Sequence, residues 1–211
     1  MIGLIIGSGE IKNYNVLIDL AKTADYVICA DGGANHLINI GINPDLVVGD
    51  LDSIDENTLK NLKETNVEIN KFPKEKDYTD TELAIKYLMD KKVDKIILVG
   101  VTGSRFDHTL ANIFLLRRLL EKGIEGQILS HKNTIYITDK KFVLEKEEGY
   151  FVSIIPLNDE GAVVTLKGFK YETDKEEFSF SSTYGISNKI IEKRGIIEIH
   201  KGTCLVIVSK D

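Results

Sequence analysis

Aspartate residues at turn positions are the side chains of this sequence that are best suited to chemistry. They occur in Asp-Gly-Gly-Ala-Asn (residues 31–35), Gly-Asp-Leu-Asp-Ser (49–53), Lys-Asp-Tyr-Thr-Asp (76–80) and Gly-Ser-Arg-Phe-Asp-His (103–108). Clustered carboxylates repel one another unless a cation or protons lie among them. Because oxygen is the only ligand atom on offer, such a cluster predicts a hard divalent cation. The candidates are Asp31, Asp50, Asp52, Asp77, Asp80 and Asp107.

The motif Gly-Asp-Leu-Asp-Ser places two carboxylates two residues apart, after a glycine at the end of a predicted strand. In extended backbone, residues i and i+2 point in the same direction. Asp50 and Asp52 are therefore expected to ligate one Mg²⁺ together or to flank one phosphate, with Ser53 as a further ligand or as a helix cap. A solvated acidic loop is the alternative.

The other acidic candidates compete with structural explanations. Asp31 precedes two glycines, which let the backbone approach a ligand closely because glycine has no Cβ, but an aspartate here equally suits a helix cap. Asp80 follows a predicted cap at Thr79, and a helix N-terminus favours negative charge. Asp77 lacks that explanation, so it is the clearer candidate for a chemical role.

Basic side chains stand beside the acidic motifs, where they suit phosphate oxygens. Lys76 directly precedes Asp77, and Arg105 lies two residues before Asp107, with which it equally suits a local surface ion pair. Gly-Ser-Gly at residues 7–9 follows the first strand, and it suits either a phosphate cradle of backbone N–H groups or a plain turn.

The remaining polar candidates show no metal-binding pattern. Residues 182–188 (Ser-Thr-Tyr-Gly-Ile-Ser-Asn) suit either contacts with a polar small molecule or a plain turn. We interpret His36, His131 and His200 as structural or surface residues, because they have no partners at metal-ligand spacing. His108 stands at a predicted helix start, where a structural hydrogen bond is expected.

Apolar strands alternate with helical patterns through the first part of the chain. Strands are predicted at residues 2–6, 26–30, 46–48, 67–71, 96–99 and 126–130, and helices at 14–23, 34–40, 55–64, 79–90 and 108–122. This alternation indicates an α/β domain whose mainly parallel sheet is covered on both faces. In such a fold the ligand crevice lies beyond the carboxyl ends of the strands, where Asp31, Asp50 and Arg105 fall.

The pattern changes after about residue 135. Short β-rich segments follow at residues 134–138, 141–144, 150–156, 162–167, 177–181, 196–200 and 203–209. Because no helical period of useful length appears among them, this half predicts a small all-β sandwich or barrel. We place an α/β domain at residues 1–137 and a β-sandwich domain at residues 138–211.

The composition predicts an ordinary globular protein that binds neither nucleic acid nor membrane. Of 211 residues, 43% are hydrophobic and 28% charged, and the net charge of −6 does not suit a general nucleic-acid binder. No apolar run reaches the roughly 18 residues of a membrane-spanning helix, and residues 1–7 lack the basic start of a signal peptide. A cytoplasmic location is expected, with Cys29 and Cys204 as buried reduced thiols.

Taken together and in this order, the motifs resemble those of the thiamin pyrophosphokinase (thiamin diphosphokinase) family. The resemblance is carried by residues 31–35, 49–53, 76–84 (Lys-Asp-Tyr-Thr-Asp-Thr-Glu-Leu-Ala), 103–108 and 185–188 (Gly-Ile-Ser-Asn). It runs nearly the full length and includes the change from α/β to β sequence. It implies a homodimer in which the active site lies between the α/β catalytic domain of one subunit and the β-sandwich of the other.

The resemblance also implies a reaction, the transfer of the pyrophosphoryl group of ATP to the hydroxyl of thiamin, which yields thiamin diphosphate and AMP. The residues that it implies as Mg²⁺ ligands are Asp50, Asp52 and Asp80, with Asp77 and Asp107 nearby as catalytic residues. Those implied at ATP are Asp31, Gly32, Lys76 and Arg105, and those implied at thiamin are Ser187 and Asn188. The sequence leaves Asp77 and Asp107 open as acceptors of the hydroxyl proton.

Two features depart from the family pattern. Many bacterial relatives follow Gly-x-Ser-Asn with Glu, whereas Lys189 follows here, which removes a negative charge near the expected position of cationic thiamin. The chain has no Trp, so stacking on the thiamin rings needs another side chain.

Two other interpretations stand beside the kinase, namely a regulatory module that binds a nucleotide without turnover and a Mg²⁺-dependent nucleotide phosphohydrolase.

Overall fold

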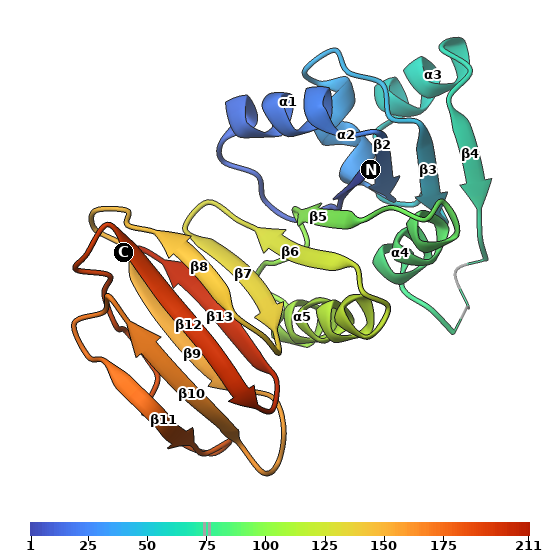
Figure 1. Ribbon diagram of the computed structural model, residues 1–211. Helices are drawn as coiled ribbons and strands as arrows, with labels where there is room; N and C mark the ends of the chain where they lie inside the picture. Colours follow the sequence, from blue (N-terminus) through green and yellow to red (C-terminus); the bar gives the residue numbers. More distant parts are fainter. Residues whose placement is uncertain (74, 76) are drawn as a thin grey trace. The chain divides into compact units, whose positions relative to one another are not determined.

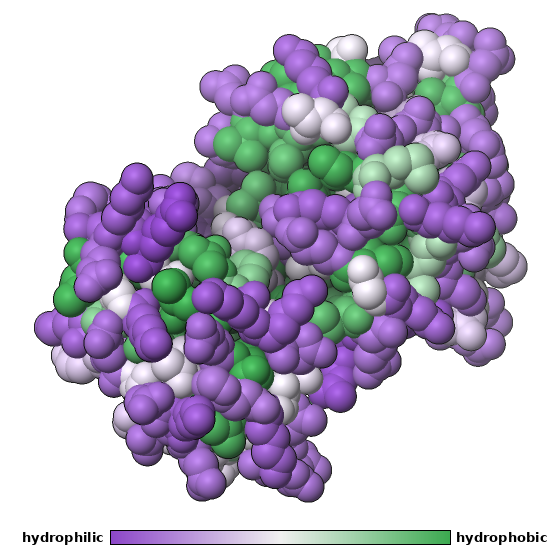
Figure 2. All heavy atoms as spheres, in the orientation of Figure 1, coloured by the Kyte–Doolittle hydropathy of each residue, from purple (hydrophilic) through white to green (hydrophobic). Residues whose placement is uncertain are grey.

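The computed structural model describes residues 1–73, 75 and 77–211, and it divides into two compact units, Met1–His131 and Lys132–Asp211 (Figure 1). The domain boundary that we place near residue 137 falls inside a strand, Asn133–Thr138, which opens the second unit. Polar side chains cover most of the face seen in Figure 2, in keeping with a chain that is 28% charged.

The first unit is built on a parallel sheet, which confirms the predicted fold class. Its strands are β1 (Ile2–Ile6), β2 (Tyr26–Ala30), β3 (Leu46–Gly49), β4 (Glu68–Lys71), β5 (Lys95–Val99) and β6 (Glu125–Leu129). They lie in the order β4-β3-β2-β1-β5-β6, and the pairings between these neighbours are parallel. Because the order reverses at β1, a crevice is expected there, beyond the carboxyl ends of β1 and its neighbours.

Helices cover both faces of this sheet (Figure 1). They are α1 (Tyr14–Thr23), α2 (Gly33–Ile38), α3 (Glu56–Glu64), α4 (Asp80–Asp90) and α5 (Phe106–Glu121). On one face, Leu17, Leu37 and Leu62 of the first three helices share a buried core with the strands. On the other face, Leu88 of α4 fills the space in which a Cβ on Gly3 would stand. The amphipathic patterns therefore predicted the helices correctly.

The second unit is an antiparallel β-sandwich. Its strands are β7 (Asn133–Thr138), β8 (Phe142–Glu145), β9 (Phe151–Pro156), β10 (Ala162–Lys167), β11 (Thr173–Phe178), β12 (Arg194–Lys201) and β13 (Cys204–Ser209). β13 pairs with β7 and β9, and a second sheet has the order β11-β10-β12-β8. Val152 and Val206 from the first of these sheets share a buried core with Val164 and Ile197 from the second. The predicted sandwich is confirmed.

One strand of this unit was predicted in the wrong place. The sequence favours residues 177–181, but β11 covers Thr173–Phe178. Most of β11 is exposed and only Phe178 is buried, so the strand has almost no apolar alternation that a sequence pattern could reveal. It is held instead by its antiparallel pairing with β10.

The two cysteines are buried free thiols, as predicted. Burial raises the pKa of the Cys204 thiol to about 12 and raises that of Cys29 further. Both thiols therefore stay protonated at neutral pH. Within the described ranges, no helix combines the length and the apolarity that a bilayer crossing requires.

The loops that carry the sequence motifs leave the sheet at one edge, because β1, β2, β3 and β5 are parallel neighbours. α2 packs tightly against this edge. A Cβ on Gly33 would lie only 2.0 Å from the carbonyl oxygen of Ile6, so glycine is required for this approach. The fold thus brings α2 and the loops after these strands together.

Candidate functional site

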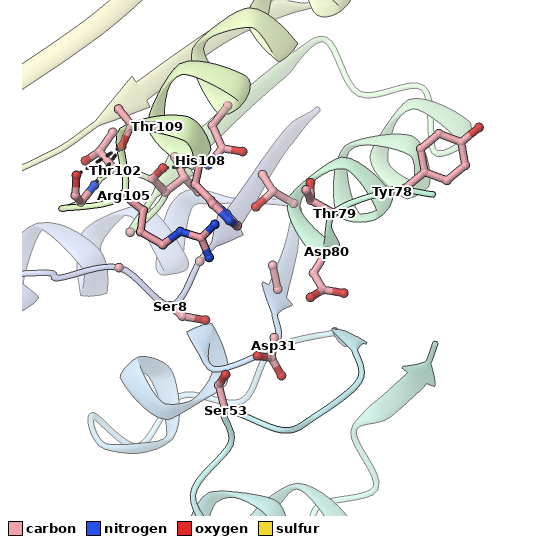
Figure 3. Close-up of a pocket in the computed structure, with 18 of the residues that line it drawn as sticks. Ser8, Asp31, Ser53, Tyr78, Thr79, Asp80, Thr102, Arg105, His108 and Thr109 are labelled. Carbon is pink, nitrogen blue, oxygen red and sulfur yellow. Dashed lines mark hydrogen bonds between the residues drawn. The ribbon is translucent and has the colours of Figure 1, made fainter. Parts of the chain in front are cut away.

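A cavity of about 700 Å³ lies at this edge of the first unit (Figure 3). It is lined by the loops after β1, β2, β3 and β5 and by the start of α4 and of α5. Ligand sites in proteins commonly measure about 300–1,000 Å³. The cavity therefore has the size of a small-molecule site and lies where the fold predicts one.

An acidic cluster borders this cavity. Asp31, Asp50 and Asp52 each offer a carboxylate oxygen, and these atoms lie within 4.8 Å of one another. Asp31 is only 8% exposed, and its Oδ1 is buried without a hydrogen-bond partner among the described residues. A buried, unpaired carboxylate oxygen is costly unless a cation compensates it. The all-oxygen donor set and this unpaired atom together fit a hard divalent cation such as Mg²⁺.

Asp31 reaches this position through the backbone and not as a helix cap. The N-cap of α2 is Gly32, without a side-chain cap hydrogen bond, so the cap interpretation of Asp31 is wrong. Its φ of 48° lies in the left-handed region, which aspartate tolerates better than most residues. Its backbone N–H donates to the carbonyl oxygen of Val48, 2.8 Å away, which places Asp31 beside the end of β3.

A turn, and not an extended strand, brings Asp50 and Asp52 together. Leu51 has a φ of 70°, and the N–H of Asp52 donates to Oδ1 of Asp50 over 3.1 Å. The Ser53 hydroxyl donates to Oδ1 of Asp52 over 3.0 Å. The predicted convergence of the two carboxylates is therefore present, but the extended geometry from which we argued it is wrong.

Asn35 holds this acidic turn from α2. Its Nδ2 donates to the carbonyl oxygen of Ser53 over 3.0 Å, and its Oδ1 accepts from the N–H of Asp55 over 3.1 Å. The sequence analysis gave Asn35 no role, although it belongs to the motif of residues 31–35. Its spacing from Asp31 is visible in the sequence, but its hydrogen-bond partners lie 18 and 20 residues further along the chain. No local pattern indicates such a contact.

Two further aspartates line the cavity from the segment before α4. Thr79 caps α4 as predicted, accepting from the N–H of Glu82 over 3.2 Å. Asp77 and Asp80 both line the cavity, and Figure 3 shows Asp80 and Asp31 directed from different elements toward the same space. The carboxylate cluster described above does not include Asp80. Lys76, expected at ATP, lies outside the described residues, as does Lys74.

Arg105 stands at the start of α5 and pairs with Asp107. Its Nη2 lies 2.6 Å and its Nε 3.3 Å from the two carboxylate oxygens of Asp107. This hydrogen-bonded ion pair lowers the pKa of Asp107 and raises that of Arg105. Both side chains are exposed, at 70% and 64%. The described lining of the cavity includes Arg105 and His108 but not Asp107 (Figure 3).

The segment Gly7-Ser8-Gly9 does not form a cradle of free glycine N–H groups. The N–H of Gly7 donates to Val99 over 2.8 Å, and that of Gly9 donates to Gly100 over 2.7 Å. A Cβ on Gly9 would also lie 2.6 Å from the Gly100 carbonyl oxygen. The two glycines serve the packing of two loops, and only Ser8 of the three presents a side chain to the cavity.

The remaining predicted residues lie around or outside this cavity. Gly32 stands behind its wall, where a Cβ would meet Ser8 Oγ at 3.0 Å. Ser187 and Asn188 belong to the second unit. The Asn188 side chain is 6% exposed and is used within that unit: Oδ1 accepts from the N–H groups of Tyr171 and Lys189, and Nδ2 donates to the Tyr171 carbonyl oxygen. Asn188 thus orders the loop, whereas Ser187 is exposed.

The site is a carboxylate-rich cavity at the carboxyl edge of a parallel α/β sheet, the class of site that binds phosphates through a divalent cation. Comparison with known proteins gives the family. Residues 17–128 match the model of the thiamin pyrophosphokinase catalytic domain, and residues 139–204 match that of the vitamin B1 binding domain. The chain belongs to the thiamin pyrophosphokinase family, which confirms the resemblance seen in its motifs.

Individual relatives agree with this assignment. Thiamine pyrophosphokinase of Bacillus subtilis strain 168 is 33% identical over 202 residues, which cover 93% of this chain and 94% of the relative. The crystal structure of the Bacillus subtilis thiamine pyrophosphokinase matches with a TM-score of 0.89 and 31% identity, covering 100% of both chains. That of the Geobacillus thermodenitrificans enzyme matches at 0.86 and 30%, covering 100% of this chain and 98% of the other.

We predict that Mg²⁺ stabilises this protein through the acidic cluster and that Asp31→Asn abolishes most of the effect. At about 100 times its Kd, a ligand specific for the folded state adds about 2.7 kcal/mol of stability. Without metal the variant is expected to be as stable as the wild type or more so, because one like charge is removed. Thermal unfolding in EDTA and in excess Mg²⁺ measures both effects.

Asp174→Asn is the matched control, since Asp174 is an exposed carboxylate of β11 in the second unit. Its Mg²⁺-induced shift should equal that of the wild type. An equal shift in Asp31→Asn would show that the cluster does not hold the metal.

Proposed function

We propose that this protein is a thiamin pyrophosphokinase, which transfers the pyrophosphoryl group of ATP to the hydroxyl of thiamin and releases AMP. Family membership supports the reaction. At the level of the site, the proposal is carried by Asp31, whose Oδ1 is buried beside Asp50 and Asp52 and has no hydrogen-bond partner among the residues that the structure describes. This arrangement is unfavourable by itself and becomes favourable when a metal-bound phosphate chain occupies the cavity.

The carboxylates of Asp31, Asp50 and Asp52 are the residues that we assign to Mg²⁺. Mg²⁺ bound there would neutralise phosphate charge during the transfer. Asp80 lines the same cavity and remains a candidate ligand of a metal held nearer to α4. The assignment adds Asp31 to the ligands that the family resemblance implies. The resemblance places Asp31 at ATP, whereas the turn motifs already made it a candidate for the cation cluster.

The transfer itself needs a nucleophile, a leaving group and a proton acceptor. The thiamin hydroxyl oxygen forms a bond to the β-phosphorus of ATP, the bridging bond from the β-phosphorus to the α-phosphate oxygen breaks, and AMP leaves with that electron pair. The hydroxyl proton passes to a base. Because the barrier depends on positioning and charge neutralisation, the protein must mainly align these groups.

Asp77 suits the role of proton acceptor better than Asp107. Asp77 lines the cavity, whereas Asp107 is not part of its described lining. The ion pair with Arg105 also lowers the pKa of Asp107, which makes that carboxylate a weaker base. We therefore assign proton transfer to Asp77 and assign Asp107 the task of orienting Arg105.

Arg105 is suited to contact the phosphates of ATP. Its guanidinium offers several donors in a fixed plane, and the pairing with Asp107 holds it at the start of α5. Figure 3 shows the Arg105 side chain at the cavity. In the second unit, we assign Ser187 to thiamin and Asn188 to the shape of the loop that presents it. Lys189 is directed over the Phe151 ring, with Nζ 4.4 Å from its centroid.

The product formed from ATP, Mg²⁺ and thiamin tests the proposal directly. Mass spectrometry should detect AMP and thiamin diphosphate in equal amounts, and neither product when thiamin is omitted. A regulatory nucleotide-binding module would yield no AMP. A nucleotide phosphohydrolase, the other alternative, would release AMP or phosphate without thiamin.

Asp52→Asn should lower turnover roughly 100-fold or more, because one carboxylate of the cluster is lost where charge develops. Circular dichroism should show an unchanged fold. Asp174→Asn again serves as the control and should retain wild-type turnover. Near-normal AMP production by Asp52→Asn would contradict the assignment of the metal.

Arg105→Gln should lower kcat/KM for ATP by about ten- to a hundredfold, the loss expected for hydrogen bonds to a charged group. Arg117→Gln is a matched control, because Arg117 lies on the same helix and pairs with Glu121 over 3.1 Å, also at the surface. Since exposed ion pairs add little stability, both variants should unfold at wild-type urea concentrations. Equal kinetic losses in the two variants would refute a phosphate contact by Arg105.

The homodimer implied by the family resemblance is also part of this proposal. Phe106, Leu110 and Phe114 follow one another along one face of α5 and are exposed, and such a stripe is typical of a covered surface. Sedimentation velocity should give the mass of two chains. Leu110→Glu should shift the protein toward monomer, whereas Val16→Glu, at an exposed apolar site on α1, should not. A monomeric wild type at all concentrations would refute the dimer.

A further inference from the structure

His36 connects α1, α2 and the loop after β1. Its Nε2 lies 2.9 Å from the carbonyl oxygen of Gly9, and its Nδ1 lies 2.8 Å from the hydroxyl of Tyr14. A carbonyl oxygen only accepts hydrogen bonds, so Nε2 must carry the hydrogen and donate to it. Nδ1 then accepts from the Tyr14 hydroxyl. Tyr14 thereby selects the one neutral form of the imidazole that is able to hold Gly9.

The surroundings of His36 favour this neutral form. The side chain is partly buried, and desolvation lowers its pKa. The Tyr14 ring packs against the imidazole with a centroid distance of 5.9 Å. The sequence analysis took His36 for a structural or surface residue because it has no metal-binding spacing. The contacts show a structural role at a specific place, because His36 binds the carbonyl oxygen of Gly9, a residue that lines the cavity.

Gly9 is held from two sides. Its N–H donates to Gly100 over 2.7 Å, while its carbonyl oxygen accepts from His36 over 2.9 Å. Gly7 is likewise bound through its N–H to Val99. Ser8 lies between these fixed residues, is exposed, and lines the cavity, as Figure 3 shows. The loop is thus fixed on both sides of one hydroxyl group.

We propose that Ser8 donates a hydrogen bond to a phosphate oxygen of the bound nucleotide and that His36, oriented by Tyr14, is the residue that positions it. A serine hydroxyl is a suitable donor to an anionic phosphate oxygen. Asn35, the neighbour of His36 on α2, holds the acidic turn through two hydrogen bonds. α2 therefore sets the separation between a phosphate donor and the metal ligands. This inference rests on the proposed function for the identity of the ligand as a nucleotide.

Equilibrium binding of ATP with Mg²⁺ measured by titration calorimetry tests this pair. Ser8→Ala should weaken binding roughly tenfold, as loss of one hydrogen bond to a charged group predicts. His36→Phe should weaken ATP binding by a similar factor, because an aromatic ring still fills the space but the N–H donor to the Gly9 carbonyl oxygen is lost. The double variant should be no weaker than the weaker single variant, since both remove the same contact. In turnover assays, the KM for ATP should rise while the KM for thiamin stays constant.

Three further variants separate positioning from general stability. His36→Gln retains a donor for Gly9 and should recover much of the affinity. Tyr14→Phe should give an intermediate loss of ATP affinity. Without the Tyr14 hydroxyl, Nδ1 of His36 loses this donor, and the imidazole hydrogen is no longer directed to Nε2. His200→Phe removes a comparable contact of 2.9 Å to Thr165 in the second unit and should leave ATP binding unchanged. If His36→Phe does not fold, His36→Gln and Tyr14→Phe still test the proposal.

The outcomes that would overturn the inference are distinct from those that would overturn the function. Wild-type affinity in Ser8→Ala would show that Ser8 makes no contact with the nucleotide. A loss in the double variant equal to the product of the single losses would show that His36 acts independently of Ser8. A wild-type protein that binds ATP but does not transfer the pyrophosphoryl group to thiamin would refute the kinase function and leave the binding test intact. A wild-type protein that binds no ATP would refute both the function and the inference.

Discussion

Electrostatic repulsion among three carboxylates is the constraint on which this site depends. Carboxylate oxygens of Asp31, Asp50 and Asp52 lie within 4.8 Å of one another, and in the described part of the chain one buried oxygen of Asp31 has no hydrogen-bond partner. The cluster persists because the backbone enforces it, through the hydrogen bond from Asp31 to Val48 and through the tight turn at Leu51. Folding energy from the core of the unit holds the charges together, and a bound cation would relieve the repulsion.

The rigid parts of the site are backbone contacts between loops, and the side chains that we assign to ligands lie between these contacts. Gly33 brings α2 against the end of β1, and Gly9 packs on Gly100. From α2, Asn35 and His36 extend to the loops on either side. Such a construction limits how far the loops move when a ligand enters, and preorganised groups stabilise developing charge more effectively than mobile ones.

Much of the fold and part of the site were predictable from the sequence. Apolar strands followed by amphipathic helices identified the parallel sheet, and the motif positions identified the edge at which Asp31, Asp50 and Arg105 meet. β11 was misplaced because an exposed strand of charged residues carries almost no periodic signal. The roles of Asn35, His36 and Asn188 were missed for a different reason, since each depends on a partner far away in the chain.

The sequence by itself determined the chemistry available and its approximate place, because residue types and periodicity are local properties. It specified an all-oxygen donor set and a change from α/β to β architecture, and its motifs carried the family. Only the tertiary structure decided which carboxylates share a space, that Asp31 joins Asp50 and Asp52, and that the N–H groups of Gly7 and Gly9 are already used. Hydrogen bonds and close approaches between distant segments made these choices, and no local pattern records them.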